Sequence, residues 1–189
     1  LKEEIDKIVD NNAKAQADFK EKAVNTDDFA KKLLGQIVFL YFLQKKGWFG
    51  VPRGKDWGEG DKQFLRHLFE RAGRAKKNFF NEYLEPLFYQ ALRYDRSADD
   101  DYFSQFDCKI PFLNGGLFDP LNDYDWINTE ILLPDRIFGN DNKTGDIGDG
   151  ILDIFDRYNF TVKEDEPLEK EVAIDPEMLG KVFENLLAI

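Results

Sequence analysis

The sequence is poor in cysteine and histidine, the side chains on which most thiol and zinc chemistry depends. Among 189 residues there is one cysteine, Cys108, and one histidine, His67. A structural zinc ion takes more ligands than one cysteine and one histidine can supply, so such a site is excluded. A catalytic Cys108–His67 pair is not excluded by spacing, but we favour a surface or packing role for His67. A single cysteine cannot form an internal disulfide, which is typical of a reducing cytoplasm.

Long apolar runs and a leader sequence are also lacking. The longest apolar run, residues 37–43, is far shorter than a membrane-spanning helix requires. Residues 1–4 have neither the basic start nor the apolar stretch of a signal peptide. The sequence begins with Leu1, its one methionine is Met178, and the apolar pattern of residues 182–189 stops midway. We therefore expect the chain to be a piece of a longer, cytoplasmic protein with no membrane contact.

Basic side chains are in the minority. The sequence has 26 Lys and Arg against 37 Asp and Glu, which gives a formal net charge of −11. A domain that binds nucleic acid by itself normally has a basic surface. Tight, autonomous DNA binding by this chain is therefore not expected, although a local basic patch within a larger assembly remains compatible with the charge.

Two local basic clusters are present. Lys45, Lys46, Arg53 and Lys55 lie near Trp48 and Trp57 in the sequence, and a second cluster consists of Arg71, Arg74, Lys76 and Lys77. Solvated helix ends would explain both clusters. Because nucleic-acid sites combine cations with aromatic side chains, the first cluster is the better candidate for contacts to a DNA backbone. We therefore predict Lys45, Lys46, Arg53 and Lys55 as nucleic-acid-binding residues.

No catalytic, cofactor-binding or metal-binding motif is recognisable. Gly115 and Gly116 lack the glycine spacing and the following lysine of a phosphate-binding loop. The aspartates of residues 141–149 do not follow the spacing of a calcium-binding EF-hand loop, and those at 123–125 break off, so turns capped by carboxylates are the favoured interpretation. The acidic run at residues 164–171 lacks the spacing of a nuclease site. We predict no catalytic residue, no metal and no cofactor within this chain.

Hydrophobic periodicity predicts a mainly α-helical fold. A polar helix is expected over residues 1–24, packing lightly. A second helix begins at Thr26 as its N-cap and runs to Gly47, and it is apolar on every side in its second half. A third helix is expected over residues 64–72, and a fourth begins after Asn78 and is kinked or restarted at Pro86.

The second half of the sequence has weaker patterns. Residues 95–124 are rich in turns, and residues 129–138 are either a short strand or an extended segment. A short helix begins at Ile151, residues 158–162 are β-prone, and Asp175-Pro176-Glu177 is a strong helix start. The expected fold is an irregular multi-helix domain with one or two short β or extended segments and long ordered loops. We expect residues 1–25 to form a linker helix towards an upstream domain, and residues 26–189 to form the helical domain itself.

Four stretches occur together, in order: FAKKLLGQIVFLYFLQKKGWFG, PFLNGGLFDP, ILDIFDRYNFTV and VAIDPEMLGKVFENLL. Together they resemble the helical region that precedes the adenine-N6 DNA methyltransferase domain in fused type IIG restriction-modification enzymes and phage-exclusion methyltransferases. The resemblance extends from Phe29 to Leu187. In that family a YTP segment, a glycine-rich S-adenosylmethionine loop and an Asn/Asp-Pro-Pro-Tyr motif follow, and none of the three is present here.

The resemblance implies a helical connector that is not itself catalytic. The parent protein would be a site-specific, S-adenosylmethionine-dependent DNA adenine methyltransferase that flips its target base, with magnesium if a nuclease is fused to it. Its partners would be double-stranded DNA and the methyltransferase and nuclease domains of the same polypeptide. The alternative is an acidic helical protein-interaction module with no nucleic-acid function, which the net charge favours. Within the resembling block, Asn114-Gly115-Gly116 is expected to let Phe112-Leu113 and Leu117-Phe118 fold onto neighbouring helices as a structural clamp.

Overall fold

The computed structural model of the protein describes residues 1–113, 115–140 and 148–157. The fold is mainly helical, as predicted. Its α-helices are α1 (Lys2–Asn11), α2 (Ala13–Glu21), α3 (Thr26–Lys45), α4 (Phe64–Ala75) and α5 (Ile151–Arg157). Two π-helical segments (Phe80–Leu84 and Leu87–Ala91) and several short 3-10 turns also occur, and loops connect these elements. None of the helices in these ranges has the length and apolar character that crossing a bilayer requires.

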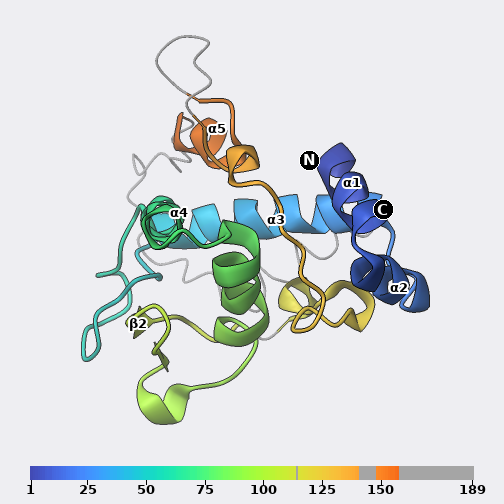
Figure 1. The fold of residues 1–189 in the computed structure, drawn as a ribbon. Coiled ribbons are helices and arrows are strands. Elements are labelled where there is room, and N and C mark those ends of the chain that lie inside the picture. The colour runs from blue at the N-terminus through green and yellow to red at the C-terminus, as the bar shows by residue number, and fades with distance from the viewer. Residues whose placement is uncertain (114, 141–147, 158–189) are drawn as a thin grey trace, which may run out of the picture.

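Helix α3 is the central element of the fold. Figure 1 shows it running through the middle of the molecule, with α1 and α2 near its N-terminal end and α4 and α5 toward its C-terminal end. Ile37, Phe39, Leu40, Tyr41 and Leu43 are all buried, as expected for a segment that is apolar on every side. The helix ends at Lys45 with Lys46 as its C-cap, and Gly47 follows with φ +70°, in agreement with the glycine predicted to terminate it.

The N-terminal segment forms two helices, so the prediction of a single helix was wrong. Asn12 separates them and caps α2, because its Oδ1 accepts hydrogen bonds from the backbone N–H groups of Lys14 and Ala15 at 3.1 and 3.2 Å. The helices do not pack lightly, since Ile5 and Phe19 join the hydrophobic core that includes α3. The division of the chain at residue 25 stays a prediction.

The N-cap of α3 also differs from the prediction. Asn25 is the cap, and its side chain accepts a hydrogen bond from the N–H of Asp27 at 2.7 Å. Thr26 is the first helical residue, and its hydroxyl donates to Asp6 of α1 at 2.5 Å. The hydroxyl therefore joins two helices instead of ending one.

The helix that contains Pro86 widens instead of breaking. Asn78 caps it as predicted, its Oδ1 accepting from the N–H of Asn81 at 2.9 Å. Pro86 has helical dihedral angles, φ −61° and ψ −36°, so the helix does not restart there. On both sides the backbone bonds reach five residues back, from Glu85 N–H to Phe80 O and from Leu92 N–H to Leu87 O. The missing N–H of proline is thus accommodated by π-helical turns.

Two short strands form where the sequence predicted only turns. Strand β1 (Tyr102–Phe103) pairs antiparallel with β2 (Cys108–Lys109), and Lys109 also bridges to Val51. Strands this short have too few residues for a period-2 pattern. Residues 130–134 are assigned neither helix nor strand, and they lead through the extended Pro134 into the 3-10 turn Asp135–Ile137. The helix predicted at Ile151 is confirmed as α5, whereas the predictions for residues 158–162 and 175–187 lie outside the described residues.

A glycine crossing fixes the loop that follows α3. Gly47 has φ +70°, and its carbonyl oxygen accepts hydrogen bonds from the N–H groups of Gly58 and Gly60 at 3.0 and 2.9 Å. A Cβ atom on Gly47 would lie 2.2 Å from the Gly58 oxygen, so the two backbone segments approach too closely for a side chain. The crossing closes residues 48–60 into a loop that carries Trp48 and Trp57.

Candidate functional site

The one thiol is not positioned for catalysis. Cys108 is buried in β2, and burial raises the pKa of its thiol to about 12. His67 lies on the exposed face of α4, and its Nδ1 is 2.5 Å from Asp61 Oδ2. This supports the surface role predicted for His67. In the ranges that the structure describes, no cluster of three or more His, Cys, Asp or Glu side chains is arranged to hold a metal ion.

The predicted nucleic-acid-binding residues fall into two pairs. Lys45 and Lys46 are at the C-terminal end of α3, and neither forms an ion pair with any other described residue. Arg53 and Lys55 are exposed on the loop after α3, where Arg53 pairs with Asp99 and Lys55 with Glu59. Exposed ion pairs are weak, so a phosphate could replace these carboxylates. It would have to compete with Asp99 and Glu59 to do so. Their binding of nucleic acid stays a prediction.

The fold brings a row of carboxylates to this loop from a distant part of the sequence. Arg53 also lies over the Tyr102 ring, and Gly54 N–H donates to Asp100 at 2.9 Å. Lys109, which is almost fully buried, places its ammonium 2.8 Å from Asp100 and 4.8 Å from the Trp57 ring centroid. No local sequence pattern indicates this arrangement, because it depends on the pairing of Val51 with Lys109.

An open cavity lies beside the two tryptophans, with a volume of about 430 Å³. Its aromatic walls are Trp48, Trp57 and Phe112. Its polar lining consists of the carboxylates Asp95 and Asp101 and the residue Ser97, and Pro111 completes it. Trp48 and Trp57 are close to lysine and arginine residues in the sequence. In the structure, however, they line a cavity together with acidic residues.

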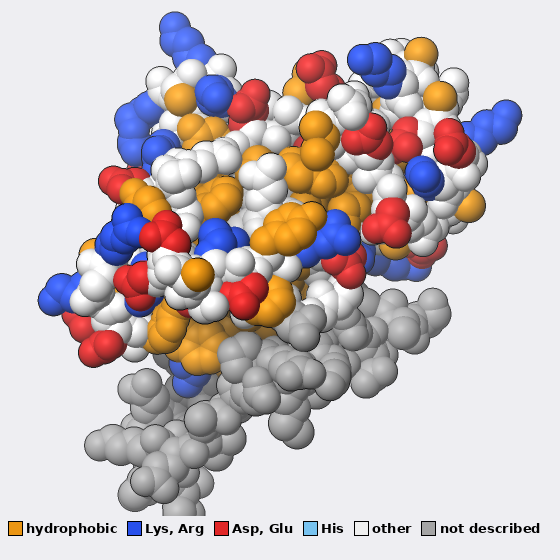
Figure 2. Space-filling model, turned by 90° about the horizontal axis from the view of Figure 1, so that it is seen from below, with side chains coloured by type: hydrophobic (Ala, Val, Ile, Leu, Met, Phe, Trp, Pro, Cys, Tyr) orange, Lys and Arg blue, Asp and Glu red, His pale blue; other side chains and the backbone are white. Residues whose placement is uncertain are grey.

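Charges of both signs alternate over the surface seen in Figure 2. On that face basic and acidic side chains are interspersed, with hydrophobic side chains exposed between them, and they do not form one continuous basic surface. This pattern fits the formal net charge of −11 and favours local over extended phosphate contacts.

The predicted clamp is present in three of its four apolar side chains. Leu113, Leu117 and Phe118 are buried, and the Phe118 ring lies 5.8 Å from the Phe39 ring and 5.7 Å from the Phe88 ring. Gln36 of α3 donates to Leu117 O at 2.8 Å, whereas Asn114 of the predicted turn lies outside the described residues. Phe112 is the exception, since 37% of it is exposed where it lines the cavity.

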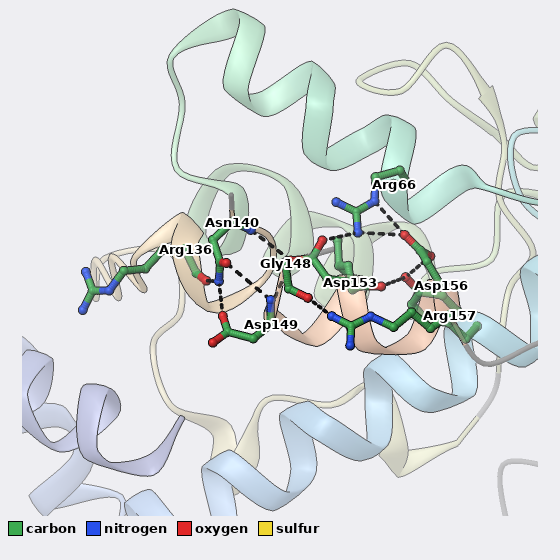
Figure 3. A network of polar contacts seen from close by, with 11 residues as sticks. Arg66, Arg136, Asn140, Gly148, Asp149, Asp153, Asp156 and Arg157 are labelled. Carbon is green, nitrogen blue, oxygen red and sulfur yellow. Dashed lines mark hydrogen bonds and ion pairs between the residues drawn. The ribbon is translucent and has the colours of Figure 1, made fainter. Parts of the chain in front are cut away.

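A polar network attaches α5 to α3 and α4 (Figure 3). Arg66 of α4 donates to Asp153 at 2.8 Å and to Asp156 at 2.7 Å. The Tyr41 hydroxyl of α3 donates to the other oxygen of Asp156 at 2.7 Å, and burial, followed by this bond, raises the pKa of Tyr41. Two acidic residues one helical turn apart thus connect three helices.

Asp153 has a second role in the same network. Its Oδ2 accepts from the N–H groups of Asn140 and Gly150, each at 3.0 Å. Arg157 donates to Gly148 O, and Asn140 Nδ2 donates to Asp149 at 2.6 Å. Asp153 therefore holds together residues 140 and 150 and binds both to α4 through Arg66. Asp153 and Asp156 belong to the recognised stretch ILDIFDRYNFTV, but no sequence pattern indicates this role for them.

A buried carboxyl group lies between the two π-helical segments. Glu85 is fully buried; its Oε1 accepts from the Tyr124 hydroxyl at 2.7 Å, and its Oε2 has no hydrogen-bond partner among the described residues. Burial raises the pKa of Glu85 well above its ordinary value, and the bond from Tyr124 opposes this only in part. Nothing in the sequence distinguished Glu85 from the other 36 acidic residues.

Comparison with known proteins gives a distant relationship. A scan against known protein families gives no match, and no solved structure is similar to the chain. The chain is 30% identical over 178 residues to a protein of Methanocaldococcus jannaschii whose name provisionally describes it as a type II restriction enzyme and methyltransferase. The match covers 89% of this chain but only 13% of that protein. The chain is thus related, over most of its length, to a segment of a restriction-modification protein.

Proposed function

We propose that this chain is the helical connector of a DNA adenine-N6 methyltransferase or fused type IIG restriction-modification enzyme. The connector would bridge the nuclease and methyltransferase parts of the polypeptide and flank the DNA. The observation that carries the proposal is the similarity to the M. jannaschii protein over 178 residues, since it covers 89% of this chain. The mainly helical fold is compatible with a supporting role.

The chemistry of the parent protein would reside outside this chain. S-adenosylmethionine supplies a methyl group for transfer to the adenine amino nitrogen, and a fused nuclease would require magnesium. The chain's own contribution would be to position neighbouring domains. The apolar side chains of its helices would pack against those domains, and the α5 network would keep the helices in place. The lone buried thiol of Cys108 is in keeping with a cytoplasmic location.

Methyl transfer provides the direct test. The complete natural protein that contains this segment is expected to methylate adenine N6 in duplex DNA, whereas the 189-residue chain alone is expected to be inactive. The encoded residues after Ile189 should include a YTP segment and an Asn/Asp-Pro-Pro-Tyr motif. A natural protein without these motifs and without methyl transfer would instead support an acidic interaction module, for which the net charge of −11 speaks.

The predicted DNA contacts can be tested separately. In the complete protein, replacing Lys45 and Lys46 by alanine should weaken DNA binding and reduce the slope of log K against log salt by about 2, because each phosphate contact releases roughly one counterion. A matched control replaces Lys14 and Lys20, two exposed lysines of α2 at the opposite end of α3 (Figure 1). Equal salt slopes for the two double variants would remove Lys45 and Lys46 from the DNA-binding surface.

A further inference from the structure

The cavity beside Trp48 and Trp57 has the dimensions and lining of a ligand site. Its volume of about 430 Å³ falls in the range of small-ligand pockets. Two of its aromatic walls, Trp57 and Phe112, are 40% and 37% exposed, which is unusual for such large apolar side chains in a chain with a well-filled core. The loop that holds Trp57 is closed by the Gly47 crossing, so this wall is held in place before any ligand binds.

The charged lining is acidic. Asp95 and Asp101 contribute carboxylates, and no lysine or arginine is among the described residues that line the cavity. The nearby cations are already engaged: the Arg96 guanidinium donates to the carbonyls of Tyr94 and Ile110, and Lys109 binds Asp100. The cavity is therefore unfavourable for a phosphate and favourable for a cation.

One of the two carboxylates lacks a partner. Within the described ranges Asp101 makes neither a side-chain hydrogen bond nor an ion pair, although it is partly buried. Asp95, in contrast, accepts from the N–H of Ser97 at 2.8 Å. Burial raises the pKa of Asp101, and the charges of Arg96 and Lys109 oppose this only in part, so a further positive charge placed beside the carboxylate would relieve its loss of solvation.

We propose that this cavity binds an organic cation, with the guanidinium group of an arginine as the best match. A guanidinium is flat and weakly hydrated, stacks on aromatic rings, and donates hydrogen bonds to carboxylates. Trp48, Trp57 and Phe112 provide the aromatic surfaces, and Asp101 provides the acceptor. The same protein region already holds cations over rings, with Arg53 over Tyr102 and Lys109 over Trp57. The inference does not depend on the connector function.

The test uses the 189-residue chain and a pair of matched ligands. N-acetyl-arginine amide is titrated against N-acetyl-citrulline amide, which has nearly the same shape but no charge. Binding is followed through the indole N–H signals of Trp48 and Trp57, and Trp126, outside the cavity, serves as an internal reference. We expect the arginine compound to shift both cavity signals with a Kd of roughly millimolar order, and the citrulline compound to bind at least about fivefold more weakly.

Two variants and two further ligands complete the test. Asp101 has φ +54°, a conformation that asparagine tolerates, so Asp101→Asn should retain the fold and weaken arginine binding about fivefold. Phe112→Ala should weaken it similarly, and Asp10→Asn on α1 should not. A short arginine-containing peptide that binds more tightly than the amide identifies a polypeptide ligand, and equal affinity identifies a free small cation. Equal binding of arginine and citrulline compounds, or Trp48 and Trp57 shifts produced by an oligonucleotide instead, would overturn the proposal.

Discussion

Replacing Asp153 by alanine is expected to lower the free energy of unfolding by about 3 kcal/mol. The change removes the acceptor of Arg66 and of the N–H groups of Asn140 and Gly150. Asp153 is only 8% exposed, so water cannot readily replace the lost oxygen atoms. Arg66 would retain Asp156, which limits the loss to less than that of a fully orphaned buried charge.

Urea denaturation followed by circular dichroism measures this change, with Asp10→Ala as the matched control. Asp10 is an exposed aspartate on α1, and its replacement should alter the free energy of unfolding by less than about 0.5 kcal/mol. A double-mutant cycle with Arg66→Ala isolates the pairwise contribution. If Asp153→Ala were as stable as the control, α5 would not be held by the network described above.

The second large effect concerns pH. Because burial raises the pKa of Glu85 in the folded state, the folded protein keeps this proton at pH values where the unfolded chain has lost it. Below the ordinary carboxyl pKa of about 4.3, both states are protonated and Glu85 causes no pH dependence. As pH rises from there toward the folded pKa, the group lowers the stability by up to about 1.4 kcal/mol for each pH unit.

Glu85→Gln removes this titration and keeps the shape of the side chain. The difference in free energy of unfolding, variant minus wild type, should therefore increase in favour of the variant between pH 5 and pH 7. Taking the difference cancels the contributions of other carboxyl groups, such as Asp6 and Asp100, whose pKa values are lowered by hydrogen bonds and whose effect has the opposite sign. Glu130→Gln, at an exposed position, is the control and should show no such trend. A pH-independent difference for Glu85→Gln would show that the carboxyl group does not remain protonated in the fold.

The elements that the sequence predicted well are those whose signal is periodic. Helices α3, α4 and α5 each present a recurrent set of apolar side chains, and burial of that set determines their position. The caps were harder to assign. Asn12 and Asn25 are the N-caps of α2 and α3, and each acts through one or two hydrogen bonds. A neighbouring residue such as Thr26 is of an equally suitable type for an N-cap, so the sequence does not distinguish them.

The candidate site was predictable only in part. Lys45, Lys46 and Trp48 are close in sequence, so their proximity could be anticipated. Asp95 and Asp101 reach the cavity through long-range contacts, such as the bridge between Val51 and Lys109, and no local pattern encodes such a pairing. Glu85 is similar, since its burial depends on Tyr124, which lies 39 residues away.

The glycine crossing after α3 separates residues that must stay apolar from residues that face solvent. Phe49 and Val51 are completely buried on one side of the loop, whereas residues 52–59 are all exposed. The crossing bonds from Gly58 and Gly60 to Gly47 hold the base of the loop independently of what lies at its tip. The outer arc can thus change its charge or aromatic content while the helices beneath keep their places. Substitutions in this arc should therefore leave the packing of the interior unchanged.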